Sequence, residues 1–421
     1  MAKVVGANDR VLILYQDATY SMLHVRPGDK FRLAKNQVAV DPIIGCPYGS
    51  VFRLEAGVLV QVDSSLFDSS SSIVDSNFLP SSDNSQLRMN SNAQKLTRDE
   101  IMELKKTMSG EEVVALLAAN SATFESKTEF SQEKWLRKKR QQHIVEIRIL
   151  RPTALTVSRM YLSDAKSDKV MGIRPDTLAM ILQKASLRPM SQVLVLDQCV
   201  GLIVASVAER LGGYGRVLAP YFTGPGPNAE CVNAFGLDLS IQNSIVHFPA
   251  ALMKDASMQD LPDDDPVLVS EYVHDASNVN AKGRTRYPEE LVRRWLANQV
   301  ESVIICARFD VESAMDACLP ILCGGGSLVI YCPYLEPLQK VALRLRQSKQ
   351  AIMVQVSENW YREYQVLTNR THPTMQMHGA SGYILSAIKT ANQLSSGPSE
   401  TPDESPDAKR HKPDDINERD T

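Results

Sequence analysis

The stretch "VLVLDQCVGLI", residues 193–203, decides how the C-terminal half of the chain folds. Its first four residues, 193–196, are branched and apolar, as expected for a strand that is buried on both faces. Asp197 closes the strand, and a helix is predicted at about 202–211. A strand that ends in an acid and leads into a helix usually opens a nucleotide-binding α/β unit. The turn of such a unit is normally rich in glycine, whereas this turn contains only Gly201.

Strands and helices alternate on both sides of this unit. A helix is predicted for "RPDTLAMILQKASL". Further strands are predicted for "GRVLAPY", for "PVLVSEYV" at 266–273, for "SVIICARFD" at 302–310, for "CGGGSLVIYCP", and for a closing antiparallel pair, "AIMVQVSENWYREYQVL" and "GYILSAIK". Gly324–Gly326 is interpreted as a turn, because it follows a helix and precedes a strand, the reverse of a phosphate loop. The alternation predicts a doubly wound, Rossmann-like α/β sheet.

The N-terminal part differs in pattern. Six short runs rich in branched and aromatic residues lie between residues 10 and 62, and they predict a small all-β barrel. Capping boxes at Thr97 with Glu100 and at Ser109 with Glu112 predict two helices, and a third is expected near Ser131. The expected domains are a β-barrel at 1–62, a disordered Ser-rich insertion at 63–94, a helical basic linker at 95–151, the Rossmann-like domain at 152–390 and a disordered acidic tail at 391–421.

The composition narrows the classes of function. The chain has 421 residues, 43% of them hydrophobic, and a net charge of −3, so the whole chain does not resemble a basic nucleic-acid-binding protein. No apolar run approaches the roughly 20 residues that cross a bilayer, and we expect no signal peptide. The seven cysteines form no C-x-x-C pair, which favours free thiols over zinc.

A pocket for S-adenosylmethionine makes three demands on such a sheet. The loop after the first strand needs glycines, so that its backbone can lie against the ligand. Counted from Asp197, the glycine positions fall on Cys199, Gly201 and Ile203, and two of these three residues carry side chains. The sequence therefore meets the first demand poorly.

The other two demands concern acids. The second strand should end in an acid that binds the ribose, but residues 216–229 contain neither Asp nor Glu. The fourth strand should end in an acid or Asn beside prolines, whereas Asp310 lies late and no proline follows it. Asp197 is either a working acid or a cap for the next turn, and capping is favoured. We therefore predict a methyltransferase-type sheet with a degenerate cofactor site, of which Asp197 and Gly201 are remnants.

Positive charge is concentrated in "KWLRKKRQQHIVEIRILR", which contains one acid, Glu146. The candidate RNA-binding residues of this segment are Lys134, Arg137, Lys138, Lys139, Arg140, Arg148 and Arg151, with Trp135 as a candidate for stacking on a base. The alternative is a solvated helix face with Trp135 packed on the core. The position of the segment between a β domain and a methyltransferase-like domain favours an RNA contact.

Several of these runs resemble one family. "QKLTRDEIMELKK", "NSATFESKTEFSQEKWLRKKR", "ILRPT", "VLVLDQCVGLIVASVAERLGGYG" and "SENWYREYQVLTNRTHPTMQMHGASGYILS" are similar to the non-catalytic, RNA-binding subunit of the tRNA (adenine-58-N1)-methyltransferase. The resemblance covers about residues 10–390. It implies that this chain binds tRNA and pairs with a paralogous catalytic subunit in a two-plus-two heterotetramer.

The resemblance also implies that S-adenosylmethionine is bound by the catalytic partner and not by this chain. The basic stretch of the family corresponds to Lys134 and residues 137–140. Arg362, Arg370 and His372 stand in the matching C-terminal run, where an RNA contact and a packing role are both open. Members of the family in eukaryotes are mainly nuclear, and "KRHK" at 409–412 is a weak match to an import signal.

Two alternatives stay open at this point. The first is a divergent but active S-adenosylmethionine-dependent RNA methyltransferase that uses Asp197, either alone or with Asp310. The second is a scaffold that contacts only protein.

Overall fold

A computed structural model gives the architecture of the chain. It describes residues 3–34, 36–55, 57–63, 95–108, 110–125, 127–163, 166–222, 226–254, 287–306, 308–366, 371–375 and 379–391. The insertion expected at 63–94 and the tail expected at 391–421 lie outside these residues, apart from Asp63 and Ala391, and so does the strand expected at 266–273. The described residues up to Thr390 belong to one compact unit.

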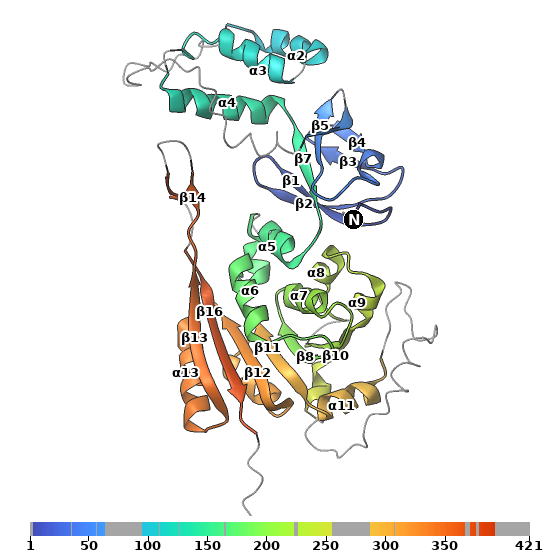
Figure 1. Ribbon diagram of the computed structural model, residues 1–421, viewed down its shortest axis with the longest axis vertical. Coiled ribbons are helices and arrows are strands. Elements are labelled where there is room, and N and C mark those ends of the chain that lie inside the picture. The colour runs from blue at the N-terminus through green and yellow to red at the C-terminus, as the bar shows by residue number, and fades with distance from the viewer. Residues whose placement is uncertain are drawn as a thin grey trace, which may run out of the picture. The chain divides into compact units, whose positions relative to one another are not determined.

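The N-terminal β domain contains a five-stranded antiparallel sheet with the order β2-β1-β7-β5-β6 (Figure 1). Its strands are β1 (Arg10–Tyr15), β2 (Tyr20–His24), β5 (Val51–Glu55), β6 (Val58–Val62) and β7 (Glu146–Leu150). The hairpin of β3 (Lys30–Leu33) and β4 (Asn36–Ala39) packs into the same hydrophobic core, and the short 3-10 helix η1 (Asp41–Ile43) follows it. The β structure expected between residues 10 and 62 is confirmed.

The central strand of this sheet comes from much later in the chain. β7 pairs with β1 on one side and with β5 on the other. It lies in the segment expected to be a helical linker, and the structure assigns residues 146–150 to the β domain instead. Ile147 and Ile149 are fully buried in the core of this domain. Their alternation with charged residues is the strand signal that the basic run obscured.

Among the described residues, three helices lie between β6 and β7. They are α2 (Arg98–Thr107), α3 (Gly110–Ala119) and α4 (Glu129–His143), and α3 packs against α4. The capping box at Thr97 and Glu100 is confirmed, with both reciprocal hydrogen bonds present. Ser109, the predicted cap of α3, lies outside the described residues. α4 begins at Glu129, slightly earlier than expected, because the Thr128 hydroxyl accepts the N–H of Ser131.

The second domain is built on a seven-stranded sheet with the order β10-β9-β8-β11-β12-β16-β13. The strands are β8 (Gln192–Asp197), β9 (Arg216–Tyr221), β10 (Ile245–Pro249), β11 (Val300–Cys306), β12 (Leu322–Cys332), β13 (Ala351–Trp360) and β16 (Ala380–Lys389). The first five in spatial order run parallel, and β16 and β13 close the sheet antiparallel. This order confirms the predicted methyltransferase-type sheet.

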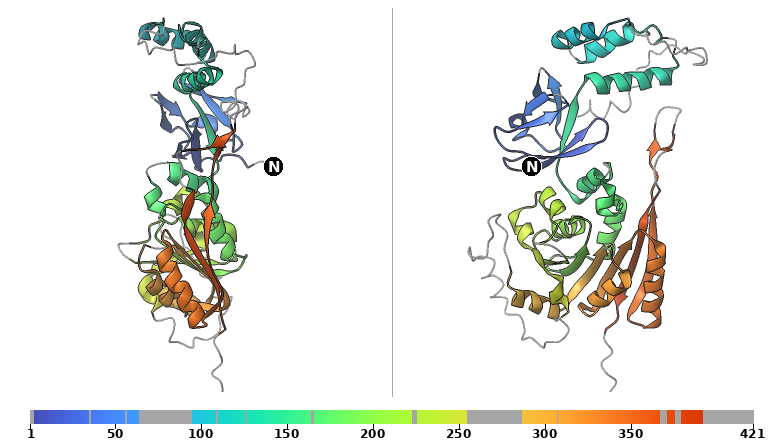
Figure 2. Two further views of the ribbon diagram at one scale, coloured as in Figure 1. Left: turned by 90° about the vertical axis from the view of Figure 1, so that its left-hand side faces the viewer. Right: turned by 180° about the vertical axis from the view of Figure 1, so that it is seen from behind.

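Helices cover both faces of this sheet (Figure 2). One face packs against α5 (Ala154–Ser163), α6 (Pro175–Lys184), α7 (Leu202–Leu211) and α8 (Glu230–Ala234), and the other against α11 (Glu289–Ala297), α12 (Val311–Cys318) and α13 (Leu335–Gln347). The remaining short elements are α9 (Leu239–Asn243), η2 (Ser167–Val170), η3 (Ala250–Met253), β14 (Tyr364–Gln365) and β15 (His372–Pro373). Within the described part of the chain, no helix has the length and apolar character of a membrane span.

The glycine run at 324–326 is a bulge and not the turn that the sequence suggested. β12 already begins at Leu322, which pairs with Val300, and the next registered pair is Ser302 with Ser327. The extra residues of β12 therefore loop out within the strand, and Gly325 takes a φ of +81°, which glycine adopts without strain. The bulge lies at the amino end of a parallel strand, opposite the edge where ligands of such sheets bind.

Candidate functional site

Asp197 stands at the carboxyl end of β8, where ligands of this fold bind. Its carboxylate accepts three backbone N–H groups, from Cys199 at 2.6 Å, Ile203 at 2.8 Å and Val204 at 3.0 Å. Burial raises the pKa of this carboxyl, and the backbone hydrogen bonds act against that rise. The side chain thus caps the start of α7, which is the role that the sequence favoured.

Gly201, the single glycine of this loop, packs against other parts of the chain. Gly201 has a φ of +85°, and a Cβ there would lie 3.1 Å from the carbonyl oxygen of Asn228 and 3.3 Å from Cγ2 of Val232. The N–H of Cys231 donates to the carbonyl of Val200 at 2.9 Å. The start of α8 therefore packs directly against the backbone of this loop. A cofactor would have to lie against the same stretch of backbone.

Cys199 and Ile203 fill the other two glycine positions with core side chains. Both are fully buried in the hydrophobic cluster that also contains Cys231 and Cys306. Burial raises the pKa of Cys231 to about 12, and it raises the pKa values of the Cys199 and Cys306 thiols well above the usual range. These thiols are therefore protonated at neutral pH and do not serve as nucleophiles.

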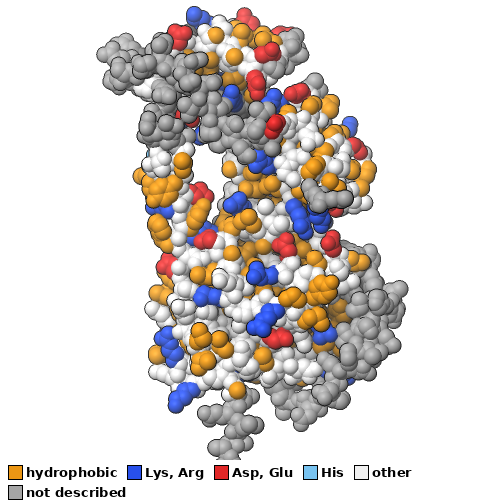
Figure 3. All heavy atoms as spheres, in the orientation of Figure 1, with side chains coloured by type: hydrophobic (Ala, Val, Ile, Leu, Met, Phe, Trp, Pro, Cys, Tyr) orange, Lys and Arg blue, Asp and Glu red, His pale blue; other side chains and the backbone are white. Residues whose placement is uncertain are grey.

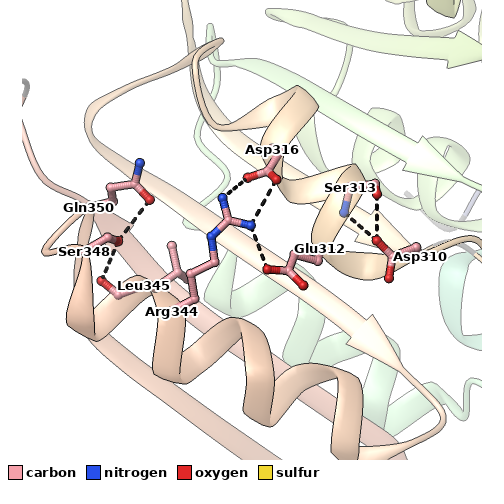
Figure 4. Close-up of polar contacts among 8 residues, drawn as sticks. All are labelled: Asp310, Glu312, Ser313, Asp316, Arg344, Leu345, Ser348 and Gln350. Atoms are coloured by element: carbon pink, nitrogen blue, oxygen red, sulfur yellow. Dashed lines mark hydrogen bonds and ion pairs between the residues drawn. The ribbon is translucent and has the colours of Figure 1, made fainter.

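The other candidate acid, Asp310, is a helix cap as well. Its carboxylate accepts the N–H of Ser313 at 2.8 Å and the Ser313 hydroxyl at 2.7 Å (Figure 4). Within α12, Glu312 of the first turn and Asp316 of the next pair with Arg344 of α13 at 2.8 and 2.6 Å. The acids after β11 are therefore engaged in helix capping and helix packing.

Contacts among several segments bridge the same edge of the sheet. The backbone N–H of Arg308 donates to Oε1 of Gln198 at 2.6 Å, and its guanidinium donates to the backbone carbonyl of Asp168. Glu230 accepts the hydroxyl of Tyr161 at 2.9 Å and forms an ion pair with Lys169 at 2.9 Å. Together with the filled loop, these contacts make the described loop after β8 a poor fit to S-adenosylmethionine.

The basic helix α4 presents a charged face to solvent. Lys134, Arg137 and Lys138 are exposed, and their spacing places them on one side of the helix. Lys139 and Arg140 are half-buried. This face can neutralise phosphate groups, because its cations are accessible and adjacent.

Trp135 lies on the packed side of α4. Its ring centroid is 5.0 Å from that of Phe124, at an interplanar angle of 56°. The ammonium groups of Lys127 and Lys139 each lie 5.7 Å from the indole centroid. The indole is thus already in contact with three side chains, an arrangement closer to the packing alternative than to a free stacking platform.

The remaining sequence candidates are scattered. Arg148 is half-buried in β7, and Arg151 is exposed just after it. Arg362 is half-buried and donates to the carbonyl of Thr374 at 3.4 Å, across the hairpin that links β13 to β16. His372 is exposed in β15, and Arg370 lies outside the described residues. Among the described candidates, those of α4 share one helix, whereas the others lie on separate elements.

The hairpin beyond β13 and β16 carries an apolar surface that the residue patterns did not single out. Its exposed residues are Trp360, Tyr361, Tyr364, Val366 and Met375, with Trp360 at 69% and Met375 at 79% exposure. Hydrophobic side chains gather over this hairpin in Figure 3. We call this group of five residues the hairpin patch. The aromatic run "SENWYREY" was the available signal, but it was interpreted only as a strand.

Arg174 holds the base of this hairpin. Its guanidinium donates to the carbonyls of Gly379 at 2.7 Å and Asn359 at 3.2 Å, and it lies 5.6 Å from the ring centroid of Tyr361. Two further bonds, at 2.9 and 2.8 Å, join it to the Asp176 carboxylate. Arg174 therefore fixes both strands of the hairpin to the start of α6.

Comparison with known proteins identifies relatives along most of the chain. A protein of Dictyostelium discoideum named as the non-catalytic subunit of tRNA (adenine(58)-N(1))-methyltransferase is 31% identical, over 93% of this chain and 81% of that protein. The mouse protein of the same name is 27% identical, over 90% of this chain and 87% of that protein.

Two solved structures are similar at lower identity. A SAM-dependent O-methyltransferase from Thermotoga maritima gives a TM-score of 0.49 at 13% identity, covering 93% of this chain and 96% of that one. The tRNA (m1A58) methyltransferase TrmI from Aquifex aeolicus gives 0.44 at 12% identity, covering 93% and 100%. Residues 4–281 match the Gcd10p family. The chain therefore belongs to the Gcd10p family.

Proposed function

We propose that this chain is the non-catalytic subunit of a tRNA (adenine-58-N1)-methyltransferase and that it binds tRNA for a catalytic partner. The observation that carries the proposal is the burial of Cys199 and Ile203 in the core at two positions where a cofactor loop needs glycine. The names of the relatives support it. Methyl transfer to N1 requires the adenine to leave its stack, and a basic surface on a second subunit can hold the RNA meanwhile.

S-adenosylmethionine is expected only in the partner. Titration calorimetry of the cofactor into the purified full chain is expected to give no heat, because the loop backbone is covered by α8. The complex with the catalytic partner serves as the positive control. Binding to the isolated chain at about micromolar affinity would instead favour the divergent enzyme. That enzyme needs Asp197 and Asp310 free, whereas both carboxylates cap helices.

The exposed face of α4 is the proposed tRNA contact. Replacing Lys134, Arg137 and Lys138 by Glu is expected to weaken tRNA binding at least tenfold and to flatten its salt dependence, since several phosphate contacts are lost. A charge-matched control replaces three exposed cations of the α/β domain by Glu, namely Arg188, Arg210 and Lys349. Equal affinity for the first triple variant and the wild type would support the scaffold alternative.

The hairpin patch is the proposed docking surface for the catalytic subunit in a two-plus-two heterotetramer. Exposed aromatic and aliphatic side chains of this size commonly mark protein interfaces. Changing Trp360, Tyr364 and Met375 to Ser is expected to release the catalytic subunit, as measured by light scattering after gel filtration. Met190→Ser with Tyr214→Ser removes exposed apolar residues elsewhere and is expected to leave assembly unchanged. An intact complex for the triple variant would exclude the patch as the interface.

We also propose a nuclear location, supported by the family resemblance and by the basic cluster "KRHK" at 409–412. Imaging of a fluorescent fusion tests it. A fusion that stays in the cytoplasm would contradict the proposal, and replacement of Lys409, Arg410 and Lys412 by Ala tests the role of the cluster.

A further inference from the structure

The loop before α4 is fixed to the helix by a buried glutamine. The amide of Gln132 donates to the carbonyl of Lys127 at 3.0 Å and to that of Glu125 at 3.3 Å. The Gln132 side chain is almost fully buried. The Thr128 hydroxyl also caps α4. These contacts fix the backbone of Lys127 relative to the first turn of the helix.

Two lysines approach the indole of Trp135. Lys127 approaches its indole from this loop, and Lys139 approaches it from one turn further along α4, each with the ammonium 5.7 Å from the ring centroid. Phe124 packs against the same ring and limits its rotation. A cation near an aromatic face is attracted to the ring, so one indole can hold two ammonium groups that otherwise repel each other.

Both ammonium groups are suited to an anion. Among the residues that the structure describes, neither lysine forms an ion pair. Burial lowers the pKa of Lys127, which means that its charged form has lost hydration that an anion could replace. Two cations beside one indole, of which Lys127 is partly desolvated, can serve the oxygens of a phosphodiester.

The pair is continuous with the exposed face of α4. At about 3.6 residues per turn, Lys138 lies between Lys134 and Lys139 around the helix. A nucleic-acid backbone that follows the exposed face would therefore reach the two lysines at its edge.

We propose that Trp135 is a positioning residue that holds Lys127 and Lys139 as a clamp for one phosphate of the tRNA backbone. This inference rests on the proposed tRNA contact of α4 and deepens it. It differs from the stacking role expected from the sequence, because a base could stack on the indole only by displacing the ammonium groups.

The test measures binding of an unmodified tRNA transcript with adenine at position 58 to the full chain in complex with its catalytic partner. Trp135→Leu removes the ring and is expected to weaken binding about three- to tenfold and to reduce the slope of log affinity against log salt by about one. Trp135→Phe keeps a ring and is expected to stay within about twofold of the wild type.

Lys127→Gln with Lys139→Gln provides a second test that leaves Trp135 in place, in case Trp135→Leu unfolds the helices. We expect the slope of log affinity against log salt to fall by about one, as for Trp135→Leu. An unchanged slope in this double variant would overturn the clamp. Tryptophan fluorescence distinguishes base stacking from the clamp. If tRNA quenches the fluorescence of the wild type and this quenching is absent in Trp135→Phe, a base lies on the indole and the clamp is wrong.

Failure of the clamp and failure of the proposed function are separable. If the triple Glu variant of Lys134, Arg137 and Lys138 loses binding while Lys127→Gln with Lys139→Gln does not, the tRNA contact stands and the clamp is wrong. If the triple variant also binds normally, the proposed tRNA contact of α4 itself is wrong.

Discussion

Arg53 and Glu146 form an ion pair inside the N-terminal sheet, with Nη2 of Arg53 2.7 Å from Oε1 of Glu146. Glu146 is only 4% exposed, and its other carboxylate oxygen accepts the amide of Gln16 at 2.9 Å. The same guanidinium donates to Glu111 of α3 at 3.1 Å. Arg53 therefore joins the central strand β7 to its neighbour β5 and, at the same time, ties the helical segment to the β domain.

Replacing Arg53 by Met is expected to lower the free energy of unfolding by about 3 kcal/mol, because Glu146 would remain buried without its cation. Urea unfolding followed by circular dichroism measures this. Arg53→Met with Glu146→Leu is the control, and it should recover much of the loss, since no charge is then left buried. If Arg53→Met unfolds at the wild-type urea concentration, the pair does not support the sheet.

Arg174 is expected to control the order of the hairpin beyond β13 and β16. Arg174→Ala should destabilise the hairpin by about 2 kcal/mol, because two carbonyl contacts and the approach to Tyr361 are lost together. Hydrogen exchange should then accelerate at residues 379–389 and stay unchanged in β8. Arg174→Lys should rescue little, since an ammonium does not reproduce the fork geometry. Full protection in Arg174→Ala would contradict this role.

The ion pair of Arg174 with Asp176 makes part of the stability depend on pH. Burial raises the pKa of Asp176, but hydrogen bonding and charge from Arg174 outweigh it, so the pKa lies below its ordinary value. The stabilisation is therefore present above the ordinary aspartate pKa of about 3.9 and is lost as pH falls through the lower folded value. Wild type should exceed Asp176→Asn in unfolding free energy at pH 7, and the difference should vanish in acid. A difference that persisted in acid would contradict this origin.

Gly382 is expected to tolerate no side chain. It has a φ of +72°, and a Cβ would lie 2.7 Å from the hydroxyl of Tyr331, which donates its hydrogen to the carbonyl of Met171. Gly382→Ala should cost about 3 kcal/mol, from backbone strain and the collision together. Gly28→Ala is the matched control, because its φ is +79° but the space is open, and it should cost about 1 kcal/mol. Equal losses in thermal unfolding would show that the collision is relieved by movement of Tyr331.

Local signals in the sequence were sufficient for much of the α/β domain. Helix α7 occupies the expected residues 202–211, because Gly212 in the left-handed conformation ends it. β10 was missed, since His247 and Pro249 interrupt its apolar run. The register that turns residues 324–326 into a bulge depends on pairing with β11, and nothing near the glycines in sequence encodes it.

The loss of the cofactor loop was predictable, because the presence or absence of glycine decides whether a ligand can lie against the loop. Filled glycine positions at Cys199 and Ile203 follow from the sequence alone, and the structure places both in the core. The surroundings of Trp135 did not follow, because Phe124 and Lys127 reach it through a loop whose path depends on Gln132. Arg174 was missed for a similar reason, since its carbonyl partners lie about two hundred residues away.

The place of β7 in the sheet has a consequence for synthesis on the ribosome. The hairpins β1–β2 and β5–β6 are complete once residue 62 has emerged, but only β7 joins them. At typical elongation rates the two nascent hairpins wait several seconds for residues 146–150, each with an unpaired edge. During that interval the apolar side chains of Val11 and Phe52 have no completed sheet to cover them, so the nascent domain is exposed to aggregation and would benefit from a chaperone.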